Sequence, residues 1–132
     1  MGFAPSPIQS YQNVGYETDI RGSDPHRLVI LLFEGALSAL DRAELSLAAK
    51  NYQDKTNALT RAIEIILDGL SASLNMDDGG EVAGNLKLLY EYMASRLTHA
   101  NFQNDLTAMN EVRGLLTELC GAWKEIAPKP SR

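Results

Sequence analysis

The sequence lacks the features that would place it in a membrane or outside the cell. Its 132 residues contain one cysteine, Cys120, which cannot form an intramolecular disulfide. The longest apolar run, 28–33, is far shorter than the roughly 20 residues that a membrane-spanning helix needs. No Lys or Arg precedes Arg21 and no apolar segment follows Met1, so a secretory signal is not expected. These absences predict a cytoplasmic protein without membrane insertion.

Clusters of basic residues are also lacking. The formal net charge is −5, and the 12 Lys and Arg residues are scattered along the chain. A protein that follows a phosphate backbone needs a concentrated positive surface. Nucleic acid is therefore not expected among the partners.

The patterns of metal sites and catalytic sites are missing as well. Ser23 and Arg96 stand three residues before the two histidines, so neither forms the Glu-x-x-His pair of di-iron bundles. The turn at 75–80 resembles the start of a calcium loop, but Leu86 occupies the position that needs a bidentate carboxylate. No glycine-rich phosphate loop or nucleophile elbow is present, and Cys120 suits a small buried residue. We expect no metal, no cofactor and no enzymatic activity.

Helical periodicity is what the sequence does contain. Apolar residues make up 45% of the chain and recur at three- and four-residue spacing in four segments. Asp24 before Pro25, Asn51, Asp78 with Glu81, and Asp105 supply predicted N-caps. Helices are expected over 25–49, over 52–74, from after Asp78 to before Asn104, and over 106–126. The expected core faces comprise Leu28, Leu32, Ala36, Ala39, Leu40, Ala43 and Leu47; Tyr52, Leu59, Ile63, Ile66, Leu67, Leu70 and Leu74; Val82, Leu86, Leu89, Met93, Leu97 and Ala100; and Met109, Val112, Leu115, Leu116, Leu119, Trp123 and Ile126.

Four amphipathic helices joined by short connections predict an all-α, antiparallel, up-down four-helix bundle. Residues 24–127 are expected to form this domain. Residues 1–23 are rich in Pro, Gly, Ser, Gln and Asn, which predicts a flexible N-terminal arm. Residues 128–132 are expected to form a disordered tail.

Three of the helices carry apolar or small residues beyond the face that the core requires. Such surplus faces favour docking of a partner helix, and small residues leave a trough that a helix can approach closely. The arm also holds apolar residues that a purely solvated segment would not need. The candidate partner-binding residues are Ile8, Tyr11 and Tyr16 in the arm; Ile30 and Leu31 in the first helix; Ala58, Ala62, Ile65 and Gly69 in the second; and Leu88, Tyr92 and His99 in the third.

A set of short motifs resembles the flagellar secretion chaperone FliS family over nearly the whole chain. Any one motif is weak, but their order and spacing together are specific. The motifs are DPHRL (24–28), LFEGA (32–36), AIEII (62–66), LSASL (70–74), GGEVA (79–83), LYEYM (89–93), EVR (111–113) and WKEI (123–126), with Ile8 and Tyr11 matching an amino-terminal I-x-x-Y.

This resemblance implies a helical-bundle chaperone of the bacterial cytoplasm. Members of the family bind the C-terminal segment of flagellin, keep it from polymerising early and present it to the flagellar type III export gate. Their amino-terminal arm is thought to lie over a hydrophobic surface that flagellin also uses. Apolar grooves on a folded surface agree with this role, because flagellin's terminal region is amphipathic.

Alternative interpretations of the surplus faces stay open. They could serve internal packing, self-association in a structural homo-oligomer, or an adaptor that binds another amphipathic helix. An enzyme would need polar residues clustered on the inner faces, where only Tyr52 and Tyr90 occur. We expect a mostly monomeric protein with weak self-association, which sizing in solution with and without flagellin would test.

Overall fold

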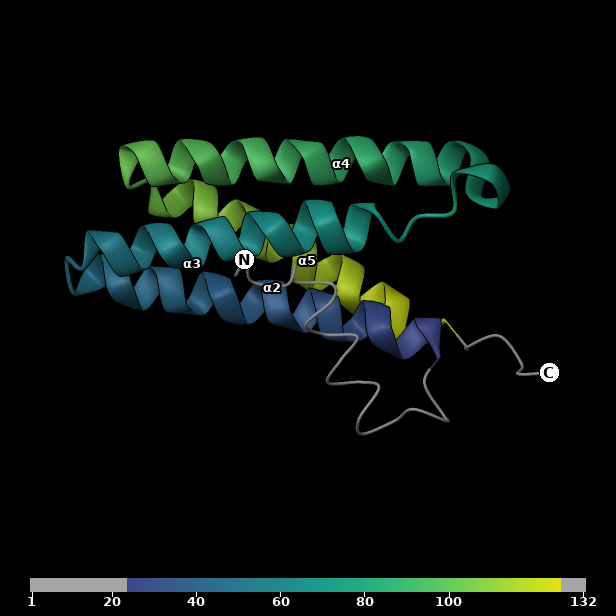
Figure 1. Ribbon diagram of the computed structural model, residues 1–132, viewed down its shortest axis with the longest axis horizontal. Coiled ribbons are helices and arrows are strands. Elements are labelled where there is room, and N and C mark those ends of the chain that lie inside the picture. Colours follow the sequence, from purple (N-terminus) through teal and green to yellow (C-terminus); the bar gives the residue numbers. More distant parts are fainter. Residues whose placement is uncertain (1–23, 127–132) are drawn as a thin grey trace, which may run out of the picture.

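The computed structural model describes residues 24–126 of the chain. It contains α2 (Pro25–Ala48), α3 (Tyr52–Glu64), the π-helix η1 (Ile65–Ser71), α4 (Met76–Gln103) and α5 (Leu106–Glu125). Because η1 continues α3 directly, these elements form four long helical segments, and this part of the chain holds no strand (Figure 1). The all-α prediction is confirmed.

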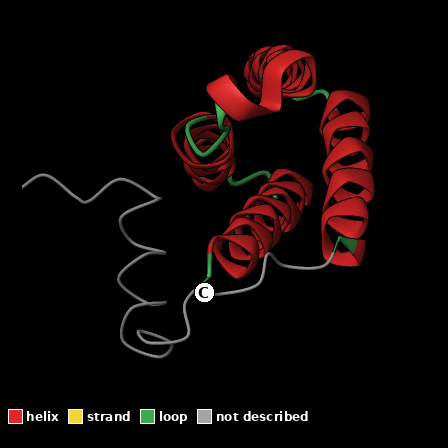
Figure 2. Ribbon diagram, turned by 90° about the vertical axis from the view of Figure 1, so that its right-hand side faces the viewer, coloured by secondary structure: helices red, strands yellow, loops and turns green. Residues whose placement is uncertain are grey.

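The four helical segments form an up-down bundle. Figure 2, which views the bundle nearly end-on, shows them arranged around a common core. α2 packs against α3 and α5, while α4 packs against α5 and against α3 with η1. The α2–α3 and α4–α5 connections lie at one end, and the η1–α4 connection lies at the other (Figure 1). We call the second of these the open end, since both termini of the described chain leave the bundle there.

Side-chain caps begin three of the helices at the predicted residues. The Asp24 carboxylate accepts from the Arg27 amide at 2.7 Å. The Asn51 side chain accepts from the Asp54 amide at 3.1 Å, and Asp105 accepts from the Ala108 amide at 3.2 Å. Each cap satisfies an amide that has no partner within its own helix.

The predicted cap of the third helix is wrong. Asn75, three residues before Asp78, is the N-cap, and its side chain accepts from the Asp78 amide at 3.0 Å. The first turn of α4 is then interrupted at Gly80, whose φ of 53° and ψ of −126° lie outside the regions open to other residues. The chain therefore makes one helical turn, changes direction, and resumes as the main part of α4.

The small-residue trough on the second helix is filled by the protein's own α2. Ala58, Ala62 and Ile65 are buried in the core at 5%, 0% and 0% exposure. A Cβ atom added at Gly69 would lie 2.9 Å from a Leu32 methyl carbon, so glycine permits the close approach of α2. The expectation that these four residues form an open partner surface is wrong, because the packing helix comes from the same chain.

Three residues assigned to core faces are instead exposed. Val82 in α4 is 67% exposed and Ile126 after α5 is 53% exposed, both at the open end. Tyr52 is 49% exposed, and its ring lies 5.8 Å from the Lys55 ammonium. A helical period identifies an apolar face but does not show how far along the helix a neighbour covers it.

A buried lysine closes the opposite end of the bundle. Lys55 is 3% exposed, and its ammonium donates to the Asn101 carbonyl at 2.9 Å and to the Asn104 side-chain oxygen at 2.6 Å. The adjacent Thr56 hydroxyl donates to the Asn101 side chain at 2.9 Å. The ammonium thereby satisfies a carbonyl in the last turn of α4, where a positive charge favours the helix dipole. This arrangement fastens the start of α3 to the end of α4.

Candidate functional site

An apolar pocket of about 360 Å³ opens at the open end of the bundle. All four helical segments contribute to it, and we call it the end pocket. Its volume falls within the range of small-ligand sites and suits one or two side chains of a partner. The lining residues are Val29, Phe33, Leu70, Ser73, Leu74, Asn75, Gly79, Val82, Ala83, Leu86, Tyr90, Leu119, Ala122, Trp123 and Ile126.

The Trp123 ring is held in the pocket wall by reciprocal contacts with His26. The Trp123 indole donates to the His26 carbonyl at 3.0 Å, and His26 Nε2 donates to the Trp123 carbonyl at 2.7 Å. The two rings stack with centroids 5.2 Å apart and planes 18° apart. These contacts join the first turn of α2 to the last turn of α5. Trp123, expected only as a core residue, thus forms a preorganised wall of the end pocket.

The Tyr90 hydroxyl is a polar group in this mainly apolar pocket. The residue is only 4% exposed, and burial raises the pKa of its hydroxyl to about 12. In the described part of the chain the hydroxyl has no hydrogen-bond partner, yet it is not fully enclosed. Buried tyrosine hydroxyls usually have a partner. The Tyr90 hydroxyl can therefore donate to an acceptor that enters the pocket.

Ionisation of Tyr90 is expected to destabilise the protein at alkaline pH. Below pH 10 the hydroxyl is protonated in both folded and unfolded chains, so its stabilising contribution is fully present. Between pH 10 and about 12 the unfolded chain loses the proton first, so the free energy of unfolding falls as pH rises. The loss is about 3 kcal/mol for a shift of this size.

Urea unfolding between pH 9 and pH 12 would measure how the free energy of unfolding changes over the range in which Tyr90 ionises. Tyr90→Phe should flatten the decline, and Tyr52→Phe, at a half-exposed position, is the matched control. An identical decline in wild type and Tyr90→Phe would contradict the assignment.

A second apolar surface lies along the outer face of α4. Leu88 and Tyr92 are 65% and 45% exposed, as expected for residues outside the core face, and Phe102 on the same side is 84% exposed. The Tyr92 hydroxyl donates to Glu111, and Arg96 Nε donates to the same carboxylate at 2.8 Å. These two hydrogen bonds, that of Tyr92 foremost, lower the pKa of Glu111. They also fix the Tyr92 ring against α5.

His99 continues this outer face toward the end of α4. Its Nε2 lies 3.2 Å from the Asp105 carboxylate, which also accepts from the Ala108 amide. The pKa of Asp105 is lowered, first by the Ala108 amide and then by His99. His99 therefore has a structural contact with the N-cap of α5 while its side chain stays about half exposed, at 47%.

The structure separates the predicted partner-binding residues into groups. Leu88, Tyr92 and His99 share the exposed face of α4, while Ile30 and Leu31 are partly buried on α2. The group at 58–69 lies in the core, as described above. Ile8, Tyr11 and Tyr16 fall outside the described residues.

Sequence analysis did not identify the end pocket. Its rim residue Val82 has the same helical period as the core residues Met93 and Leu97, so periodicity placed it in the core. The GGEVA motif offered a signal, because it combines the Gly80 kink with Val82 at the pocket rim. Only the tertiary structure shows that the four helical segments end in positions that leave the apolar face around Val82 partly uncovered.

Two further properties concern residues 24–126. No three His, Cys, Asp or Glu side chains lie close enough together there to hold a metal ion. None of the helices in this range combines the length and the apolar character that crossing a bilayer requires.

Comparison with known proteins identifies the family. The profile of the family described as "Flagellar protein FliS" matches residues 7–130. The chain is 46% identical to the flagellar secretion chaperone FliS of Salmonella typhimurium, covering 98% of this chain and 96% of that protein. It is 40% identical to the protein of the same name from Escherichia coli, covering 98% and 95% of the two chains. It is 38% identical to the flagellar secretion chaperone FliSB of Pseudomonas aeruginosa, covering 95% and 98%. These relatives are named as chaperones and not as enzymes, and the chain belongs to the FliS family of flagellar proteins.

Proposed function

We propose that the protein is a cytoplasmic export chaperone for flagellin. It binds the C-terminal segment of flagellin, prevents premature polymerisation and delivers the client to the flagellar type III export apparatus. Membership of the FliS family supports this proposal, since its named relatives are flagellar secretion chaperones. The choice of flagellin as the client goes beyond family membership, and it depends on the apolar surface that the bundle offers.

The open, apolar end pocket is the observation that carries the proposal. Val82 and Ile126 stay more than half exposed at the rim, beside the apolar pocket, so together they leave a patch of apolar area that a partner can cover. An amphipathic client helix can place an apolar side chain between Phe33 and Trp123. The Tyr90 hydroxyl would donate to a client acceptor, which adds a polar contact of defined position.

The outer face of α4 offers a second contact for a long client segment. Leu88 and Tyr92 present apolar area beside the Arg96–Glu111 ion pair, with His99 further along. Ile30 and Leu31 on α2, and Ile8, Tyr11 and Tyr16 in the amino-terminal segment, remain proposed contacts. A client that wraps across several such surfaces buries more area than one pocket allows, at the cost of ordering the segment.

Co-purification with flagellin tests this function. Intact flagellin should co-purify with the protein, whereas flagellin lacking its C-terminal segment should not. Size measurement of the mixture should show a complex with one copy of each chain. Equal capture of both flagellins would exclude the C-terminal segment as the client site. Self-association that intact flagellin leaves unchanged would favour a structural homo-oligomer.

A further inference from the structure

The first turn of α4, residues 76–79, is folded down against the start of the remaining helix. Figure 2 shows this turn displaced from the axis of the rest of α4, and the direction changes at Gly80. A Cβ atom added at Gly79 would lie 2.6 Å from the Ala83 Cβ. In a regular helix, Cβ atoms four residues apart are about 5–6 Å from each other. The turn, which we call the flap, therefore covers Ala83, and Ala83 is only 4% exposed.

The folded position of the flap needs two adjacent glycines for two separate reasons. The φ of 53° and ψ of −126° at Gly80 are open only to a residue without a Cβ atom. Gly79 has no room for a Cβ atom because Ala83 lies directly beside it. A straight α4 would need neither glycine, since alanine favours a helix over glycine. Each glycine thus favours the folded position over the straight one.

The contacts that build the flap are local. The Asn75 side chain donates to the Asp78 carboxylate at 3.1 Å, in addition to its bond with the Asp78 amide. The Gly79 amide donates to the Asn75 carbonyl at 2.7 Å. These bonds all lie within 75–79, and every residue from 75 to 82 is exposed. A segment with local bonds and no buried side chain can move at small cost in free energy, so the flap can turn as a unit about Gly80.

The flap forms one side of the end pocket. Asn75 and Gly79 line the pocket beside Val82 and Ala83. Straightening at Gly80 would carry residues 75–79 out of the wall and uncover Ala83. Residues 74 and 75 lie in no helix or strand, so the connection to η1 can follow this movement. The folded flap leaves a pocket of about 360 Å³, whereas a straight flap would open it along the start of α4.

We propose that the flap is a hinged wall that decides which occupant the end pocket takes. With the flap folded down, the pocket takes a single apolar side chain or a small apolar molecule. With the flap straightened into α4, it takes a helical segment of the client. The choice of this larger occupant rests on the proposed function, whereas the hinge does not. The client's apparent affinity is then reduced by the fraction of free molecules whose flap is straight.

Gly79→Ala and Gly80→Ala test the hinge, because each disfavours the folded flap by a different cause. Binding of the neutral dye N-phenyl-1-naphthylamine is followed by energy transfer from Trp123, the single tryptophan, which lines the pocket. Both variants should bind the dye about five-fold more weakly, the effect of losing contact with roughly 40 Å² of apolar wall. Gly84→Ala is the matched control, since its added Cβ atom meets nothing within 4 Å, and it should leave dye affinity unchanged.

A flagellin C-terminal peptide should respond in the opposite direction. Gly79→Ala and Gly80→Ala should bind it several-fold more tightly, up to about ten-fold if about one-tenth of free wild-type molecules have a straight flap. Gly84→Ala should again match the wild type. Both flap variants should also melt close to the wild-type temperature, because a hinged turn relieves the strain by straightening. Damage to the pocket alone would weaken binding of both probes.

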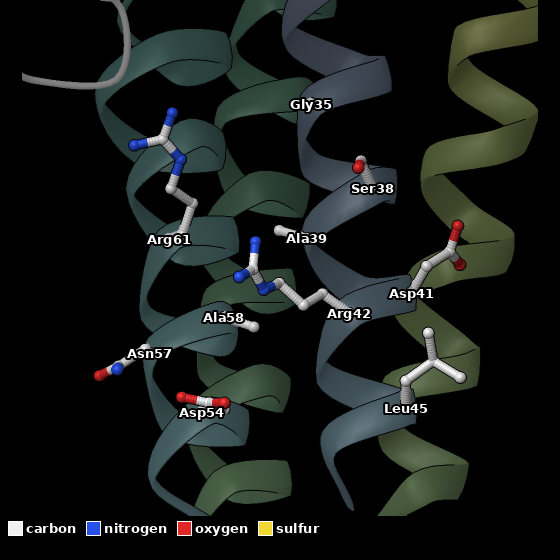
Figure 3. Close-up of a pocket in the computed structure, with 10 residues that line it drawn as sticks. All are labelled: Gly35, Ser38, Ala39, Asp41, Arg42, Leu45, Asp54, Asn57, Ala58 and Arg61. Atoms are coloured by element: carbon white, nitrogen blue, oxygen red, sulfur yellow. The ribbon is translucent and has the colours of Figure 1, made fainter.

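A second groove, between α2 and α3, is the other place where the dye can bind. Its volume is about 630 Å³, and Figure 3 shows its lining, which carries charges of both signs. None of its lining residues belongs to the end pocket. Leu45→Glu at this groove should leave energy transfer from Trp123 unchanged, whereas Val82→Glu should reduce it. The reverse result would place the small occupant in the groove and overturn size selection by the end pocket.

The remaining outcomes separate the hinge from the client. Weaker binding of both probes with a lower melting temperature would show that the kink at Gly80 is fixed, and unchanged binding of both probes would also overturn the hinge. Weaker dye binding with wild-type peptide affinity would show that the client binds both flap positions equally, which overturns the selection. If the wild type binds the dye but not the peptide, the proposed client fails at this pocket. Weaker dye binding by both flap variants at an unchanged melting temperature would then still support the hinge.

Discussion

Ile65→Glu is expected to unfold the bundle rather than only to weaken client binding. Ile65 is fully buried at the start of η1, within the core cluster that α2, α3 and α4 enclose. A carboxylate there would lose its hydration without gaining a positive partner, which costs several kcal/mol. That cost is comparable to the whole stability of a small domain, about 5–15 kcal/mol. The same substitution at an exposed position on an outer helix face would instead leave the fold intact.

Thermal melting and urea unfolding would measure the effect of Ile65→Glu. Ile65→Val is the matched control, because it removes one methylene group and should cost about 0.5–1.5 kcal/mol. Retention of the wild-type melting temperature by Ile65→Glu would show that this position is not buried in solution. Loss of client binding by this variant must therefore be interpreted together with its stability.

Val82→Glu is expected to lose client binding while the fold is preserved. Val82 is 67% exposed at the rim of the end pocket, so the new carboxylate stays hydrated in the free protein. An apolar client segment that covers the rim would have to strip water from the charge. The expected loss is about 2 kcal/mol, or roughly 30-fold in affinity, as for a central residue of an interface.

Titration with a flagellin C-terminal peptide measures this loss. Trp123 is the single tryptophan of the chain and lines the end pocket, so its fluorescence reports occupancy. Leu106→Glu, an exposed apolar residue at the opposite end of the bundle, is the matched control and should keep wild-type affinity. Wild-type affinity in Val82→Glu would remove the end pocket from the client site and leave the outer face of α4 as the candidate surface.

Local sequence determined the helices and most of their ends. Asp24 with Pro25, Asn51 and Asp105 each bond an amide within the next three residues, so their effect needs no distant neighbour. The exposed face of α4 was also predictable, since Leu88 and Tyr92 lie off the face that carries Met93 and Leu97. The order of short motifs was sufficient to identify the family.

Only the tertiary structure decided which apolar faces are covered. Ile65 and Val82 are both aliphatic residues at helical spacing, yet one lies in the core and the other at an open rim. The difference arises because α2 fills the trough beside Gly69, whereas no helix within residues 24–126 extends over Val82. Periodicity specifies the direction of a side chain from its helix axis, while burial depends on the length and position of neighbouring helices. The same reason hid Lys55, whose partners Asn101 and Asn104 come from a helix end distant in sequence.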